Sequence, residues 1–581
     1  MNFQRENSSI CSENWIQDSQ EHKVYQLDNE ENKLVKIIIQ VTLTKDQKIV
    51  YQKNGTILRI EQVYDTSRDP EILNYMEQIQ HLSWQGQYAL NNKKNGKWMV
   101  SWDENLIKDA SGYYYDGKKQ GLWIDLIQNY WIQAQVFETG EYLNDLKIGN
   151  WNYICNKNKI GGGLYNKDNS KQGKWIELDE GFCMAKKVIY RGEYNMRGMK
   201  VGIWDIYYFK DGENQYKQIG GGSYGQEGQI KIGKWVELDE GFYRRKQVTC
   251  SGEYNIKGMK IGRWDICYCK DGEKQYKQIG GGLYDQEGQI KIGKWVELDE
   301  GFYRDKQITY HGEYELKGMK IGRWNIVNKG QKIGGGIYSV GNSQIKIGKW
   351  TELDEKFNRD KQVIYSGEYN MKGMKIGRWD IHYCDRWGDG EYIQIGGGSY
   401  DEGENQIKIG RWVQLDEGFN TNKKVTYSGE YNMKGMKVGR WDIIHNKSAD
   451  DEFEYIGGGS YDEVEGQLKI GSWVDLWEGF QFYAQVTYSG EYNKKGQKIG
   501  VWQILYDKSG DGEYEQIGGG SYDEELGQIK IGRWVELDES FFEENQITYN
   551  GDYNMKGKKI GTWVEMDILE NKLIGEKIYN N

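Results

Sequence analysis

The sequence predicts an all-β protein: an elongated antiparallel ribbon of tandem β-hairpins, preceded by a small N-terminal cap of strands and one short helix. The first observation behind this prediction is that tryptophan recurs regularly along the 581 residues. Counted from Trp151, the steps alternate between 29 residues and a variable 24 to 33 residues. The second observation is the composition. With 14% aromatic residues, 77 glycines and one proline, the chain favours short strands that pack rings over a thin sheet.

The N-terminal part lacks the repeat and divides into a tail and a cap. Residues 1–23 are polar and mostly acidic, and we expect them to be disordered. The cap is predicted over residues 24–84, with one strand at Lys33–Leu43 and a strand pair on either side of an Asn-Gly turn at residues 54–55. A helix is predicted over residues 70–80, because an Asp-Pro pair is a typical helix start.

The first of two alternating module types is clearest around Trp324. Before the turn, Tyr310, Gly312 and Tyr314 alternate along one face of an extended strand. Gly318 follows where the chain is expected to reverse, since glycine adopts positive φ without strain. Trp324 then lies on the return strand, and Gly312 leaves room for a large ring to cross the backbone. Each module is therefore predicted to be one hairpin.

The second module type contains three consecutive glycines, a variable acidic loop and a second tryptophan strand. Its phase is unexpected, because the alternation of a strand puts Trp295 on the same face as Glu297 and Asp299, and the apolar Val296 on the other face. Two explanations stay open at this point: a bulge that shifts the face, or rings on both faces of the sheet.

The repeat is predicted to span residues 85–563, and residues 564–581 are expected to form capping strands at the last edge. A residue that recurs in every module is first of all one that the module needs in order to stack on its neighbours. We therefore assign a structural role to three columns. They are Trp204, Trp235, Trp264, Trp295, Trp324, Trp350, Trp379, Trp412, Trp441, Trp473, Trp502, Trp534 and Trp563; Tyr194, Tyr254, Tyr314, Tyr369, Tyr431, Tyr492 and Tyr553; and Gly192, Gly252, Gly312, Gly367, Gly429, Gly490 and Gly551.

The strings Tyr-Ser-Gly-Glu-Tyr at residues 365–369 and Gly-Met-Lys-Ile-Gly at residues 373–377 resemble the MORN repeat. That family's pattern is Tyr-x-Gly-x-aromatic, a short glycine-containing turn, and Gly-x-Gly. Here the turn is one residue longer and Trp replaces the last Gly, as in the MORN-like variant repeats of bacterial antitoxin-type proteins, which residues 112–123 look most like. The resemblance implies an extended β-hairpin ribbon, often dimeric, that acts as a scaffold near membranes or the cytoskeleton.

Charge and hydropathy exclude several function classes. The net charge of −11 argues against nucleic-acid binding and gives no general attraction to anionic lipid. No run of 18 apolar residues suggests a membrane-spanning helix, and the N-terminus has no apolar signal-peptide core, so we expect a cytoplasmic protein. The seven cysteines do not follow the repeat, which favours reduced thiols over a disulfide framework.

Candidate chemistry is repeated rather than unique. Paired carboxylates such as Asp239 and Glu240 recur in many modules, whereas a catalytic acid and base would occur once in a cleft. The triple glycines precede a strand and lack the Gly-Lys-Ser/Thr of a phosphate loop. Cys267 and Cys269 lack a second ligand pair for zinc, and the five histidines are scattered. We expect no enzyme, no metal site and no cofactor.

The sequence therefore favours a non-enzymatic repeat scaffold that binds other proteins in the cytoplasm, with cytoskeletal association and homodimerisation left open. Two alternatives are retained. One is a peripheral membrane or phosphoinositide binder that uses the basic columns Lys257, Lys260 and Arg263 with their copies. The other is a carbohydrate or choline binder, because Trp/Tyr/Gly-rich hairpins also build cell-wall-binding repeats. The identity of any partner is not predicted.

Overall fold

The computed structural model describes residues 18–28, 33–67, 69–341, 344–385, 390–403, 405–446, 453–464 and 466–579. It confirms the predicted fold class: the chain is all-β, with an N-terminal four-stranded sheet, an open 35-strand antiparallel hairpin ribbon and one short helix in the described part. The chain divides into unit 1, Met1–Ile292, and unit 2, Gly293–Asn581, which are described separately. No helix among the described residues is long and apolar enough to cross a membrane.

Unit 1 contains the four-stranded sheet, the helix and the first part of the ribbon. Its elements are β1 (Asp18–Asp28), β2 (Lys33–Leu43), β3 (Lys48–Lys53), β4 (Thr56–Gln62), α1 (Met76–His81), β5 (Leu82–Tyr88), β6 (Lys94–Trp102), β7 (Asn105–Tyr115), β8 (Lys118–Leu126), β9 (Val136–Leu143), β10 (Leu146–Cys155), β11 (Asn158–Tyr165), β12 (Lys171–Leu178), β13 (Val188–Tyr194), β14 (Lys200–Tyr208), β15 (Lys217–Tyr224), β16 (Lys231–Leu238), β17 (Val248–Tyr254), β18 (Lys260–Tyr268) and β19 (Lys277–Tyr284).

Unit 2 continues the ribbon, and β20 begins two residues before it. Its elements are β20 (Lys291–Leu298), β21 (Ile308–Tyr314), β22 (Lys320–Asn328), β23 (Gln331–Tyr338), β24 (Lys346–Leu353), β25 (Val363–Tyr369), β26 (Lys375–Tyr383), β27 (Ile393–Tyr400), β28 (Lys408–Leu415), β29 (Val425–Tyr431), β30 (Lys437–Asn446), β31 (Phe453–Tyr461), β32 (Lys469–Leu476), β33 (Gln485–Tyr492), β34 (Lys498–Asp507), β35 (Glu515–Tyr522), β36 (Lys530–Leu537), β37 (Ile547–Tyr553), β38 (Lys559–Asp567) and β39 (Lys572–Tyr579).

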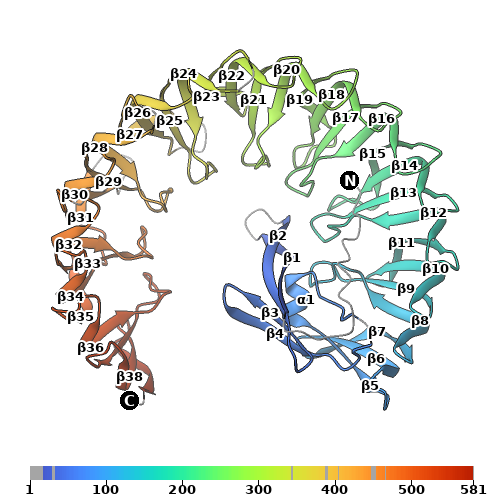
Figure 1. Ribbon diagram of the computed structural model, residues 1–581, viewed down its shortest axis with the longest axis horizontal. Helices are drawn as coiled ribbons and strands as arrows, with labels where there is room; N and C mark the ends of the chain where they lie inside the picture. The colour runs from blue at the N-terminus through green and yellow to red at the C-terminus, as the bar shows by residue number, and fades with distance from the viewer. Residues whose placement is uncertain are drawn as a thin grey trace. The chain divides into compact units, whose positions relative to one another are not determined.

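The N-terminal sheet has the order β1-β2-β3-β4, and α1 packs between it and the start of the ribbon (Figure 1). Met76 and Ile79 of α1 are buried against Val24 and Ile39 of the sheet. Two features differ from the sequence-based expectation. The helix begins at Met76, because residues 70–74 have no regular secondary structure and Tyr75 is extended, and residues 18–23 of the expected tail belong to β1. The rest of that tail, residues 1–17, lies outside the described residues.

The hairpins follow the predicted glycine positions. In the module of Trp324, Gly318 has a φ of 78° in the turn between β21 and β22, and Gly322 has a φ of 60° on β22. The pairing register between β21 and β22 shifts between His311 and Glu313, which marks a bulge around Gly312. A Cβ on Gly312 would lie 2.1 Å from Cδ2 of Trp324, so the ring lies directly over the glycine backbone.

The core of the ribbon is one continuous ladder of rings in each unit. Trp324 contacts Tyr314 on one side and Tyr338 on the other, with ring centroids 5.3 and 6.3 Å apart and both pairs edge-to-face. The thirteen tryptophans of the predicted column are 1–5% exposed. Because every tryptophan takes its tyrosine partners from neighbouring strands, each hairpin depends on the next one for its core.

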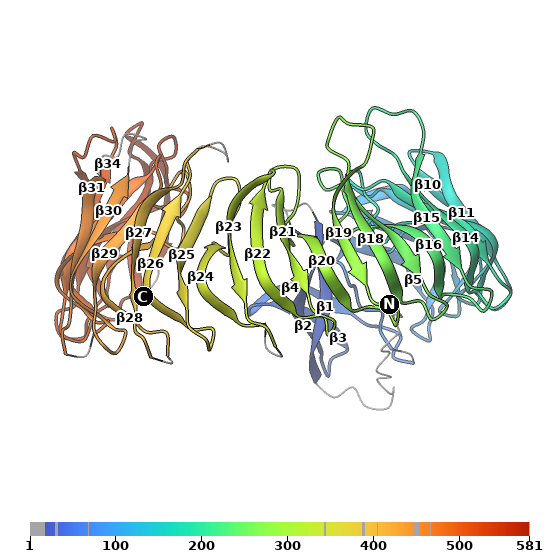
Figure 2. The same ribbon diagram turned by 90° about the horizontal axis from the view of Figure 1, so that it is seen from above.

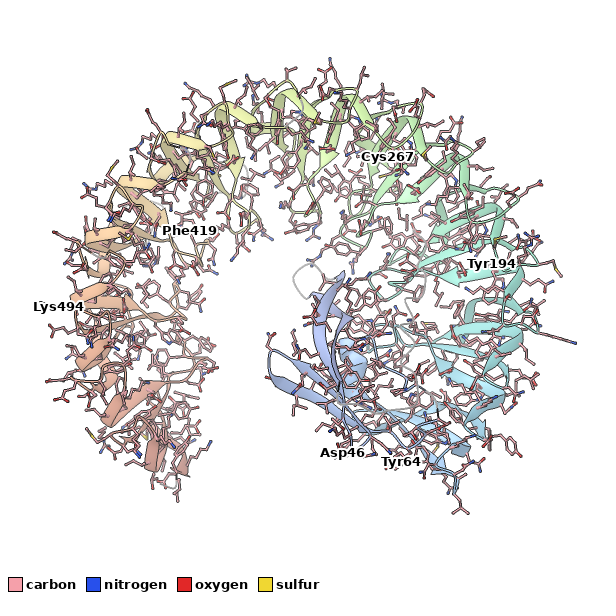
Figure 3. The ribbon with its side chains drawn as sticks, in the orientation of Figure 1. Asp46, Tyr64, Tyr194, Cys267, Phe419 and Lys494 are labelled. Atoms are coloured by element: carbon pink, nitrogen blue, oxygen red, sulfur yellow. The ribbon has the colours of Figure 1, made fainter. Side chains whose placement is uncertain are left out.

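The strands lie side by side, so each unit collects its connections along two edges of the ribbon (Figure 2). We call one the turn edge; in unit 2 its described residues are 315–319, 339–341, 344–345, 370–374, 401–403, 405–407, 432–436, 462–464, 466–468, 493–497, 523–529 and 554–558. We call the other the loop edge; it carries the longer connections such as residues 299–307 and 416–424. Phe419 of the loop edge and Lys494 of the turn edge lie on opposite sides of the ribbon of unit 2 (Figure 3).

Candidate functional site

The ring-bearing face also carries a charge network, which resolves the unexpected phase of Trp295. The register between β20 and β21 is regular from Gly293 to Leu298, so Glu297 lies on the same face as Trp295. Its carboxylate accepts a hydrogen bond from the Tyr314 hydroxyl at 2.7 Å and pairs with the Lys320 ammonium at 2.9 Å. No bulge shifts the face between β20 and β21, and the acid is neutralised within the ladder.

The lysines of this network lie over the rings. Nζ of Lys320 is 4.1 Å from the centroid of Trp324, a typical cation–π distance. In unit 1, the Glu177 carboxylate pairs with the ammonium groups of Lys171 and Lys200, the latter at 2.7 Å. It also accepts a hydrogen bond from the Tyr194 hydroxyl at 2.5 Å. Burial by itself would raise the pKa of Glu177, but the two ammonium groups outweigh it and lower the pKa to about 2.

Most residues of the basic columns proposed for lipid contact already pair with carboxylates or lie over rings of the ladder. Lys260 pairs with Glu237 at 3.0 Å and lies 3.9 Å from the centroid of Trp264. Nε of Arg263 pairs with Asp265 at 2.8 Å. Lys257 differs, because it is exposed in the turn that precedes β18.

The repeated carboxylate pairs of the loop edge are structural turns. Asp299 pairs with Lys306 at 2.7 Å, accepts the Tyr310 hydroxyl at 2.9 Å and accepts the Gly301 amide at 3.0 Å. Its neighbour Glu300 is exposed to solvent. The aspartate is thus held by three donors within its own hairpin, an arrangement that orders the loop.

The triple glycines belong to strands and do not form a phosphate loop. The middle residue Gly281 has a φ of 123°, and a Cβ there would lie 2.2 Å from the Trp264 carbonyl oxygen. The glycines therefore allow two strands to approach closely at a bulge.

Cysteine and histidine side chains do not converge. Cys267 is half-buried and Cys269 is buried, and no cluster of three or more possible metal ligands occurs among the described residues. His311 contacts Thr309 on the same strand, and His81 at the end of α1 contacts Asp103 in the turn between β6 and β7.

A groove in unit 1 follows the ring-bearing face next to the turn edge. It has a volume of about 1370 Å³ and is lined by Tyr165, Tyr194 and Tyr224 together with Lys171 and Lys200. These lysines lie over the tryptophans, and both bind Glu177. The groove is therefore a surface of the ladder itself.

The turn edge presents apolar side chains at its tips. In unit 2, Leu316, Met371, Met433 and Met555 occupy the same turn position and are 66–81% exposed. Val340, Val464 and Leu526 are exposed in the intervening turns, and Lys494 interrupts the row. Basic residues follow the equivalent tips, as Lys434 follows Met433.

The predicted columns of Trp, Tyr and Gly meet in the ladder, whereas the exposed tips were not singled out from the sequence. The turn sequence nevertheless contains a pattern that could have predicted them. The second residue of the turn is Met, Ile or Leu in most copies of the string Asn/Glu-x-Lys/Arg-Gly, although a solvent-exposed turn does not require an apolar residue there.

Comparison with protein-family models finds none that matches the chain, and a search of curated proteins finds no significant match.

Proposed function

We propose that this protein is a non-enzymatic repeat scaffold that binds other proteins through its turn edge. The observation that carries the proposal is the row of exposed apolar tips, Leu316, Met371, Met433 and Met555, at one repeated position. A single exposed apolar residue is ordinary on a protein surface. A row of them at equivalent positions of one edge is a regular surface to which a partner with an apolar stripe can bind at several points.

The spacing of the tips supports multivalent binding. Equivalent tips are four strands apart, which corresponds to about 19 Å at the usual strand separation. Each contact by itself is small, but linked contacts raise the overall affinity because every contact after the first is intramolecular. The ring-bearing face is less suited to this role, since its polar and aromatic groups already bind one another.

The charge of the turn edge favours protein over an anionic lipid surface. The tip lysines alternate with exposed acidic residues of the intervening turns, such as Glu402, Glu463 and Glu525. Opposite charges at this short spacing cancel much of the attraction to anionic lipid. A protein partner with a matching pattern of charges tolerates the same alternation.

Quantitative capture of proteins from the native cell tests the proposal. The full chain is compared with a tip variant that carries Leu316→Ser, Met371→Ser, Met433→Ser and Met555→Ser. A matched control removes exposed aromatic residues from the loop edge of the same unit, with Phe482→Ser, Tyr483→Ser and Phe542→Ser. We expect the tip variant to lose at least tenfold in retained partner and the control to keep it. Equal retention by all three proteins contradicts the proposal.

A further inference from the structure

One module of unit 2 differs from the others in the charge network of the ring-bearing face. Where the equivalent strands carry Glu297, Glu352, Asp475 and Glu536, strand β28 carries Gln414. The Tyr431 hydroxyl donates to Oε1 of Gln414 at 2.8 Å, so the side chain occupies the place of the carboxylate. The substitution is therefore local: it removes one negative charge and leaves the geometry of the ladder in place.

Two lysines lose their counterion through this substitution. In the module of Glu352, one carboxylate binds both Lys346 and Lys375, and Nζ of Lys375 is 3.1 Å from Oε2. Lys408 and Lys437 are the equivalent residues around Gln414. Nζ of Lys408 is 3.4 Å from Oε1 of Gln414, and neither lysine forms an ion pair with a carboxylate in the described part of the chain.

Both ammonium groups are held in place by rings. Nζ of Lys408 lies 4.6 Å from the centroid of Trp412, and Nζ of Lys437 lies 4.3 Å from that of Trp441. Burial and the neighbouring Lys408 and Lys469 lower the pKa of Lys437 to about 8, and burial also lowers the pKa of Lys408. The two cations are therefore close, partly desolvated and insufficiently neutralised, which is an unfavourable state that a bound anion relieves.

We propose that Lys408, Lys437 and Gln414 form a binding site for a phosphate group, either inorganic phosphate or a phosphate monoester. The charge supports a dianion, because two ammonium groups face a neutral amide. The amide supports it as well, since Nε2 of glutamine donates where a glutamate would repel the ligand. Three donor groups suit the oxygens of phosphate better than the two oxygens of a carboxylate. The equivalent lysines Lys346 and Lys375 keep 36% and 25% of their side chains exposed, so a ligand can approach from solvent.

Titration of the full chain with inorganic phosphate at constant ionic strength, followed by calorimetry, tests the proposal. We expect one site in the natural protein and binding at least tenfold weaker in Gln414→Glu. This variant restores the residue type of the equivalent strands, so it is expected to fold and to unfold at a higher temperature. Acetate is expected to bind more weakly than phosphate. Phosphate binding that is absent, or equal in the natural protein and Gln414→Glu, overturns the proposal.

Because the modules are alike, a second phosphate site can be created by one substitution in another module. Glu352→Gln recreates the same arrangement around Lys346 and Lys375, and we expect it to raise the stoichiometry from one site to two. A stoichiometry that stays at one, with the variant's circular dichroism unchanged, contradicts the assignment of these residues as the site. Comparison of phosphate with phosphoserine distinguishes the sources. Tighter binding of phosphoserine indicates a monoester ligand, and equal or weaker binding indicates the free ion.

Discussion

At the scale of single residues, the ladder depends on rings that lie over glycines. Gly312 lies beneath the ring of Trp324, and we predict that Gly312→Ala destabilises the module by about 1–3 kcal/mol, the usual range for overpacking. Gly575→Ala is a suitable control, because a Cβ there meets nothing closer than 3.6 Å and its φ is not in the left-handed region. Chemical denaturation of both variants measures the difference. Equal loss in the two would show that the close approach of ring and backbone is unimportant.

The buried carboxylates predict an acid-dependent loss of stability. The pKa of Glu177 is lowered from 4.5 to about 2 in the folded chain. The folded pKa is below the unfolded one, so the stabilisation is present above pH 4.5 and is lost as the pH falls towards 2. Thermal unfolding between pH 5 and pH 2 should show a decline that is smaller in Glu177→Gln. An identical pH profile for the variant would mean that this carboxylate is not stabilised by its lysines.

The same residues show what the sequence could and could not predict. The periodic Trp, Tyr and Gly columns were sufficient to predict the hairpins, because alternation and glycine position are local properties. The phase of Trp295 with Glu297 could not be explained in this way. The lysine that neutralises Glu297 comes from β22, and the sequence does not show that this lysine lies against the ring-bearing face of β20. The late start of α1 also depends on tertiary contacts, since Met76 and Ile79 are held by the four-stranded sheet.

At the scale of the hairpin, the buried rings of each hairpin pack against rings of the neighbouring hairpins. We predict that Trp324→Ala costs about 3–5 kcal/mol locally, the range for removal of a large buried ring. Because the ring contacts Tyr314 and Tyr338, the loss should be concentrated in β21, β22 and β23 and should decline with distance along unit 2.

Hydrogen exchange of Trp324→Ala, resolved by peptide, measures this decline. Ser366→Ala on β25 serves as a control for a small change on a strand of the same unit, and we expect little effect from it. Exchange that rises equally along the whole of unit 2, or that leaves β21 to β23 unchanged, is inconsistent with coupling between nearest neighbours.

At the scale of the whole molecule, charge separates a protein scaffold from a lipid binder. The chain has 88 acidic and 77 basic residues, and lysines beneath the turn edge such as Lys260 and Lys320 are neutralised by carboxylates of the ladder. We therefore predict no appreciable binding to phosphoinositide-containing vesicles at physiological salt. Cosedimentation measures this directly. Salt-sensitive binding that charge reversal at Lys257, Lys317, Lys372 and Lys434 abolishes would favour the membrane alternative.

The central claim is that protein partners bind at the turn edge, whereas the ladder of rings holds neighbouring hairpins together. Hydrogen exchange of the full chain with and without a captured partner tests it most directly. We predict protection in residues 315–319, 370–374, 432–436 and 554–558, with no change in the loop-edge residues 299–307 and 416–424. Protection confined to the loop edge, with the turn edge unchanged, would contradict the account.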